Sequence, residues 1–109
     1  MGSEQRTERG LARAWRFREQ TRHAFGRLEH VLAHESATWR DIVRMTAYVA
    51  DASHIRTFFE VQRRVLGDAP PTVMKVAKFS SLQKLVEVGA TAVVPLPMSS
   101  RGVDRGTLD

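Results

Sequence analysis

The chain has 109 residues, a length that fits one domain with a modest core of its own. It contains no cysteine, which excludes disulfides, thiol chemistry and cysteine-ligated metals. The apolar runs are far shorter than a membrane span and no signal-peptide pattern opens the chain, so we expect a cytoplasmic protein. Seventeen Lys and Arg against twelve Asp and Glu give a formal net charge of +5.

Much of the excess positive charge lies in an Arg-rich segment, residues 1–17. If this segment is helical, its arginines recur at three- and four-residue spacing and fall on one face, namely Arg6, Arg9, Arg13 and Arg16. Such a stripe could meet phosphate or an acidic partner. A solvated helix face is the simpler interpretation because no nucleic-acid motif accompanies the stripe, so nucleic acid is not expected as a partner.

The first regular elements are a helix and a strand. Apolar residues recur at helical spacing from Leu11 to about His34. From Asp41 to Val49 the period changes to two, which is typical of a strand. One face of this strand is predicted to carry Val43, Met45, Ala47 and Val49, and the other Arg44, Thr46 and Tyr48.

A second helix and two more strands follow. Asp51 or Ser53 can cap the helix, and Gly67 stands where a helix C-terminus favours a positive φ. After two prolines, runs from residue 72 to 79 and from 85 to 94 predict a hairpin with a turn at residues 80–84. Residues 96–109 have no periodicity and are expected to be disordered.

The predicted order is therefore helix, strand, helix, strand, strand. This order indicates an α+β fold in which two helices pack on one face of a small sheet. Three strands offer less surface than two amphipathic helices need. The sequence thus already favours an oligomer, or a chain that lacks strands at its front.

Glu87 is the candidate catalytic residue. Strict alternation in the last strand places Val86, Val88, Ala90, Ala92 and Val94 on one face. Glu87 falls on the other face, together with Leu85, Gly89, Thr91 and Val93. A lone carboxylate in a strand of small and apolar residues is costly to bury unless a partner or a reaction uses it.

No metal site is predicted. His30 and His34 have the four-residue spacing of a two-histidine half-site, but a third ligand is absent and a surface pair is the simpler interpretation. His23 and His54 are lone histidines for which solvent-exposed or capping roles are expected.

The chain resembles the Rid family, the YjgF-like reactive-intermediate (imine) deaminases, also described as endoribonuclease L-PSP-like. The matching segments are Gln20-Thr-Arg with its helix, residues 39–51, the helix from Phe59 to Leu66, Pro70-Pro71, and Val86-Glu-Val-Gly-Ala-Thr-Ala-Val93. The resemblance covers residues 18–95. It implies a chorismate-mutase-like fold with a mixed sheet, assembled as a homotrimer with a cleft between each pair of subunits. It also implies hydrolysis of enamine or imine intermediates to a carbonyl compound and ammonia, with no metal or cofactor.

Two departures from the family pattern bear on function. The resemblance implies that Glu87 positions the attacking water, whereas Val73 stands where the family has the Arg that grips the substrate carboxylate. Met74 and Lys75 follow and complete the expected substrate-binding set. The family's N-terminal hairpin has no counterpart before Glu19, so the fold is expected to be N-terminally shortened.

The hairpin predicts how these residues meet. If Phe79 pairs with Leu85, then Ala77 faces Glu87 and Lys75 lies one diagonal step away. Glu87 would then serve either catalysis or a plain ion pair with Lys75.

Two functional hypotheses follow, beside a less expected third, nucleic-acid contact through the stripe from Arg6 to Arg16. In the first, the protein hydrolyses an imine or enamine that lacks the usual carboxylate, because Val73 cannot bind one. In the alternative, it is a catalytically inactive trimer that binds a small ligand or a partner protein.

Overall fold

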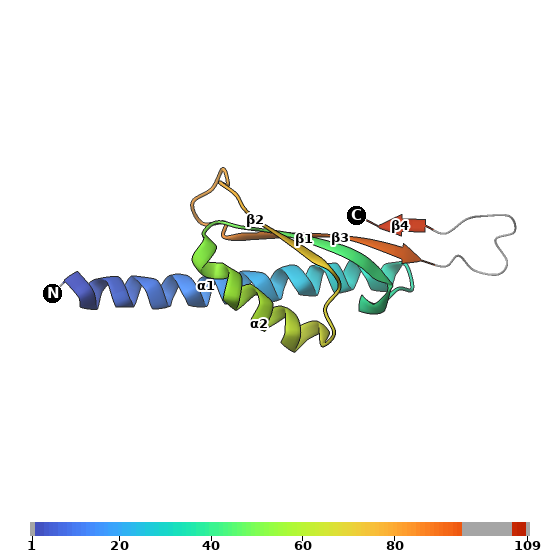
Figure 1. Cartoon of the computed structure of the whole chain (residues 1–109), viewed down its shortest axis with the longest axis horizontal. Helices are drawn as coiled ribbons and strands as arrows, with labels where there is room; N and C mark the ends of the chain where they lie inside the picture. The colour runs from blue at the N-terminus through green and yellow to red at the C-terminus, as the bar shows by residue number, and fades with distance from the viewer. Residues whose placement is uncertain (1, 95–105, 109) are drawn as a thin grey trace, which may run out of the picture.

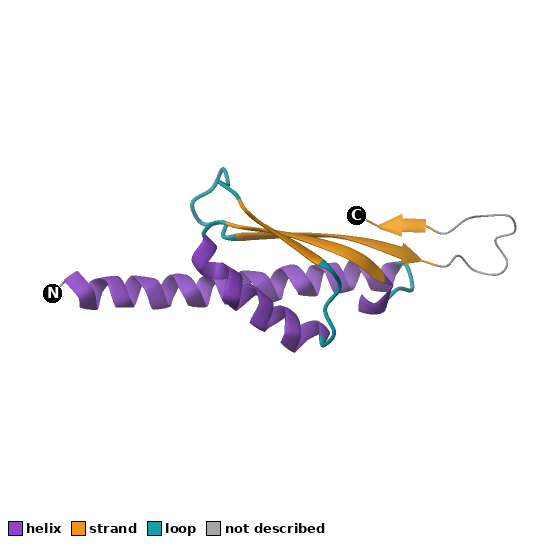
Figure 2. Cartoon of the chain, in the orientation of Figure 1, coloured by secondary structure: helices purple, strands orange, loops and turns teal. Residues whose placement is uncertain are grey.

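The computed structural model describes residues 2–94 and 106–108, in which two long helices cover one face of a mixed sheet (Figures 1 and 2). The helices are α1 (Gly2–His34) and α2 (Ile55–Leu66), and two short 3-10 helices, η1 (Trp39–Asp41) and η2 (Ala52–His54), precede β1 and α2. The strands are β1 (Ile42–Val49), β2 (Thr72–Val76), β3 (Val86–Val94) and β4 (Gly106–Leu108). The predicted α+β class with both helices on one face is confirmed.

Helix α1 is longer than the sheet and its N-terminal part projects beyond it (Figure 1). The packed part is held by fully buried side chains at helical spacing, Phe17, Thr21, Phe25 and Leu32. The helix ends in a Schellman motif, in which the N–H of Ala37 donates to the carbonyl of Leu32 at 2.8 Å. Ser36 takes the left-handed conformation, φ 57°, that this motif requires.

The strands have the order β2-β1-β3-β4. Strand β2 pairs parallel with β1, and β3 pairs antiparallel with the other side of β1. The predicted hairpin between β2 and β3 is therefore wrong, and with it the pairing of Phe79 with Leu85 and of Ala77 with Glu87. β1, α2 and β2 instead form a strand-helix-strand crossover, which brings β2 back to the far side of β1.

The two faces of β1 mostly follow the predicted alternation. Met45, Ala47 and Val49 are fully buried against the helices. Val43 was expected on the same face but is 50% exposed, and Ile42 is buried in its place. The reason is a register irregularity between Ile42 and Arg44, which shifts the alternation by one residue at the start of the strand.

Helix α2 is fixed at both ends and in its middle. The carboxylate of Asp51 accepts the backbone N–H of Ser53 at the turn that precedes it, and Gly67 ends it with φ +75° as predicted. In its middle, the buried Gln62 donates to the hydroxyl of Thr72 at 2.9 Å and contacts the Met45 sulfur at 3.3 Å. These contacts tie α2 to β1 and to the start of β2.

His54 is buried, contrary to the expected solvent-exposed or capping role. Its ring stacks on Phe17 with the centroids 4.3 Å apart and the planes nearly parallel. The side chain makes no capping hydrogen bond to α2, and among the described residues its Nε2 has no hydrogen-bond partner. Burial, followed by the nearby Arg13 charge, lowers the pKa of His54, and Asp51 opposes this shift.

The C-terminal segment lies mostly outside the described residues, so the prediction of disorder for residues 96–109 is untested there. Residues 106–108 are described, and they form β4, which pairs antiparallel with Ala92–Val94 of β3. Within the described ranges, no helix has the length and apolar character needed to cross a membrane.

Candidate functional site

Three of the four predicted site residues, Val73, Lys75 and Glu87, lie on the face of the sheet turned away from the helices. Tyr48 of β1 lies directly between Lys75 of β2 and Glu87 of β3 in the strand register. These three side chains therefore form a row across three adjacent strands on the uncovered face. The Nζ of Lys75 lies 5.9 Å from the centroid of the Tyr48 ring, a cation–π distance.

Glu87 forms an ion pair with Lys84 rather than with Lys75. The Nζ of Lys84 lies 2.5 Å from Oε1 of Glu87, and the two side chains are 46% and 54% exposed. Lys75 is two strands away from Glu87, or about 10 Å across the sheet. The alternative of a Lys75–Glu87 ion pair is therefore wrong, because β1 lies between their strands.

A second row runs beside the first. Thr46 of β1 lies between Val73 of β2 and Gly89 of β3, and Val73 is 46% exposed. This row places a small, uncharged surface next to the row that contains Glu87. Met74, the fourth predicted site residue, instead packs against the hydrophobic core on the helix side of the sheet.

The uncovered face can therefore position a water molecule, whereas the side chain of Val73 itself offers no group that binds a carboxylate. An exposed ion pair contributes only about 0–1 kcal/mol, so Glu87 can exchange Lys84 for a ligand or a water at small cost. A carboxylate in that position can orient water and accept its proton. The cations beside this row are Lys75, two residues after Val73 on β2, and Arg44, two residues before Thr46 on β1, and neither stands at the position of Val73, where the resemblance implies the arginine that grips the carboxylate.

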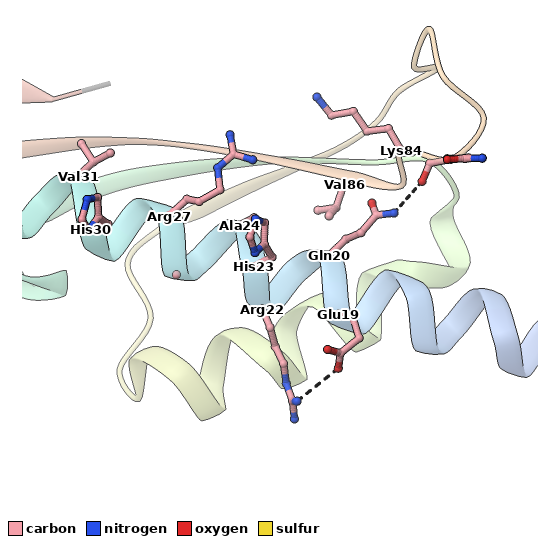
Figure 3. A pocket seen from close by; sticks show the side chains of 12 residues that line it. Glu19, Gln20, Arg22, His23, Ala24, Arg27, His30, Val31, Lys84 and Val86 are labelled. Atoms are coloured by element: carbon pink, nitrogen blue, oxygen red, sulfur yellow. Dashed lines mark hydrogen bonds and ion pairs between the residues drawn. The ribbon is translucent and has the colours of Figure 1, made fainter.

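Gln20 is a positioning residue whose role was not predicted from the sequence. Its side-chain amide donates to the carbonyl of Gln83 at 2.7 Å, and its side-chain oxygen accepts the N–H of Leu85 at 2.9 Å. These two bonds hold the segment that carries Lys84 against α1, just before Glu87 (Figure 3). Gln20 is the first residue of the Gln-Thr-Arg motif, and this motif is the sequence signal that could have identified it.

The histidine pair on α1 lies at the surface, as predicted. His30 and His34 are exposed, with ring centroids 5.7 Å apart and edge-to-face. Among residues 2–94 and 106–108, no group of three or more His, Asp or Glu side chains is placed to hold a metal ion.

Comparison with known proteins agrees with this architecture. The sequence profile described as endoribonuclease L-PSP matches residues 2–94. A crystal structure of Rv2704 from Mycobacterium tuberculosis, described as a member of the YjgF/YER057c/UK114 family, is 36% identical with a TM-score of 0.62. That match covers 66% of this chain and 63% of the other.

More distant structures share the fold. A putative endoribonuclease L-PSP from Entamoeba histolytica is 24% identical, with a TM-score of 0.63 over 68% of this chain and 60% of that one. RidA from an Antarctic Psychrobacter is 17% identical, with a TM-score of 0.51 over 64% and 58%. The chain thus spans a little under two thirds of the length of these relatives. No curated protein gives a match.

Proposed function

Because the chain belongs to the endoribonuclease L-PSP family, the YjgF/RidA family, we propose that it hydrolyses an imine or enamine that lacks a carboxylate beside the reacting carbon. The observation that supports this most is the exposed carboxylate of Glu87, on the same face of the sheet as the uncharged row of Val73, Thr46 and Gly89. A family member with an arginine at that position would instead favour imino acids.

The proposed reaction needs only water and the side chain of Glu87. The carboxylate accepts a proton from water as the water oxygen bonds to the imine carbon, and the imine nitrogen takes up a proton. In the resulting amino alcohol, Glu87 passes the hydroxyl proton to the nitrogen, the C–N bond breaks, ammonia leaves and the C=O bond forms. Water and imine are thereby converted to a carbonyl compound and ammonia, with no electron transfer and no cofactor.

We place this reaction in a homotrimer, as the family resemblance implies. The uncovered face of the sheet carries Thr46, Val73 and Tyr48, which a second subunit could cover. Covering this face would exclude water from most of the sheet, and the resemblance implies a cleft between each pair of subunits. Such enclosure strengthens the interaction of Glu87 with a bound water.

Two imines made in situ test the substrate preference. An amino-acid oxidase supplies an imino acid, and a flavin-dependent amine oxidase supplies an imine without a carboxylate. We expect the protein to accelerate ammonia release only from the second. Faster release from the imino acid alone would contradict the proposed role of Val73.

The Val73→Arg variant tests the same point from the other side. We expect it to gain hydrolysis of the imino acid, because an arginine adds a bidentate carboxylate donor beside Thr46. Val73→Leu is the control, since it changes size but not charge. If neither variant gains imino-acid hydrolysis while both fold as wild type, the placement of the substrate over Val73 is wrong.

The second candidate is a binding protein without catalysis. The ion pair between Lys84 and Glu87 favours it, because the Lys84 ammonium occupies a carboxylate oxygen that would otherwise bind the attacking water. A Lys84→Met variant separates the two functions: faster hydrolysis supports catalysis by Glu87, whereas no hydrolysis of either imine by either protein supports binding.

A further inference from the structure

Part of one edge of β3 has no neighbouring strand within residues 2–94 and 106–108. It pairs with β1 from Val86 to Ala92 on one side, whereas on the other side β4 pairs only with Ala92–Val94. Among the described residues, no strand lies along the other side of β3 between Val86 and Ala90. This part of the edge is about 13 Å long at the usual rise per residue.

The direction of the backbone groups on this edge follows from the pairing of β1. The N–H of Met45 donates to the carbonyl of Pro71 at 2.8 Å, so Met45 and its alternate neighbours point toward β2. Thr46 and Tyr48 then point toward β3, where they face Gly89 and Glu87. The residues of β3 whose N–H and C=O groups point to the free edge are therefore Val86, Val88 and Ala90.

An open groove lies between this end of β3 and α1 (Figure 3). Its volume is about 1270 Å³, and it is lined mainly by one side of α1 and by residues 83, 84 and 86. Ala24 and Val31 form an apolar part of its surface, and Val31 is 48% exposed. A strand added to the edge would place every second side chain over this side of α1.

The groove is basic. Its cationic lining residues are Arg22, Arg27 and Lys84, against the single carboxylate of Glu19. Glu19 pairs with Arg22 at 3.4 Å, and Lys84 is engaged by Glu87 on the other face of the sheet. Arg27 has no ion pair or hydrogen bond within the described part of the chain, so a net positive charge faces the groove.

We propose that the free edge of β3 and this groove bind an extended acidic segment of a partner protein by strand addition. The backbone of the segment pairs with Val86, Val88 and Ala90, while its acidic side chains reach Arg27. The same edge of a second copy is a poorer occupant, because it would bring two basic grooves together. This site lies on the helix side of the sheet, whereas Glu87 faces the other side, so peptide binding can be measured without the proposed reaction.

A labelled ten-residue peptide of alternating Thr and Glu is the probe, with binding followed by fluorescence anisotropy. We expect this peptide to bind and the corresponding Thr-Lys peptide not to bind. In an added strand, the amides of one residue type face β3 and those of the other face solvent. N-methylation of one set should therefore abolish binding, while N-methylation of the other set leaves it intact. Equal effects of both sets would overturn strand addition.

Matched charge reversals test the groove. Arg27→Glu should weaken peptide binding about tenfold or more, because it replaces the unpaired cation with a like charge. Arg64→Glu makes the same charge change on the exposed face of α2 and should leave binding unchanged. Equal losses in the two variants, or tighter binding of a ten-residue oligouridylate than of the acidic peptide, would overturn the proposal.

Discussion

His54 buries a titratable ring nitrogen that has no hydrogen-bond partner among the described residues. Because burial lowers its pKa, the unfolded chain takes up a proton at a higher pH than the folded protein does. Stability is therefore unaffected by this group above about pH 6.5 and decreases as the pH falls below that value. The decrease ends at the folded pKa.

The thermal midpoint measured between pH 7.5 and 5 tests this assignment. We expect it to fall toward pH 5 in the wild type and to fall less in His54→Phe, which keeps an aromatic ring against Phe17. His23→Gln is the control, since His23 is exposed and its loss should keep the wild-type slope. An unchanged slope in His54→Phe would contradict the assignment.

Asp51 acts in a separate pH range. The backbone N–H of Ser53 donates to its carboxylate at 2.8 Å and lowers its pKa, with further lowering by the Ser53 side chain. A carboxyl group whose pKa is lowered by folding stabilises the fold when the pH is above the ordinary carboxyl pKa. This stabilisation is lost as the pH falls below about 4. The two groups can thus be told apart in one acid titration.

At the scale of elements, hydrophobic periodicity and the positions of capping residues, glycine and proline predicted most of the helices and strands. Both helices, strands β1 to β3 and the positive φ of Gly67 are confirmed. Alternation gave the correct helix-facing side of β3 because a strand has a fixed period of two. Alternation did not predict which strand lies beside β3, because the buried and exposed residues of β3 alternate in the same way whichever strand is its neighbour.

For the candidate site, too, the sequence predicted which face of the sheet a residue lies on but not which residues are neighbours. Val73, Lys75 and Glu87 lie on one face, as alternation requires, but β1 separates the last two. Met74 lies on the opposite face, against the core, because adjacent residues in a strand point to opposite sides of the sheet. The partner of Glu87, Lys84, sits in a loop whose conformation depends on Gln20, a contact between residues far apart in the sequence.

Two glycines of the helices should respond oppositely to alanine. Gly67 has φ +75°, where a Cβ is strained although nothing lies within 4 Å of it, so Gly67→Ala should lower the unfolding free energy by about 1–2 kcal/mol. Gly26 lies inside α1 with equally open space, so Gly26→Ala should raise it by about 1 kcal/mol. Denaturant unfolding measures both values. A shift of the same sign in both would contradict the conformational account.

At the scale of the whole molecule, the uncovered face of the sheet predicts self-association. We expect light scattering on a sizing column to give the mass of three chains. A Cβ at Gly89, on this face, meets nothing within 4 Å in the single chain, so Gly89→Arg should preserve the fold and lower the mass to one chain. Gly10→Arg adds the same side chain on the exposed start of α1 and should leave the trimer intact. A wild-type mass of one chain would contradict the trimer.

The role of Glu87 is tested most directly by ammonia release from the carboxylate-free imine, compared between the wild type and Glu87→Gln. Glutamine keeps the size of the side chain but cannot accept the proton of water, and the lost pair with Lys84 costs little because both partners are exposed. We predict release above the spontaneous rate for the wild type and at the spontaneous rate for the variant, with equal thermal midpoints. Equal acceleration by both proteins would contradict catalysis by Glu87.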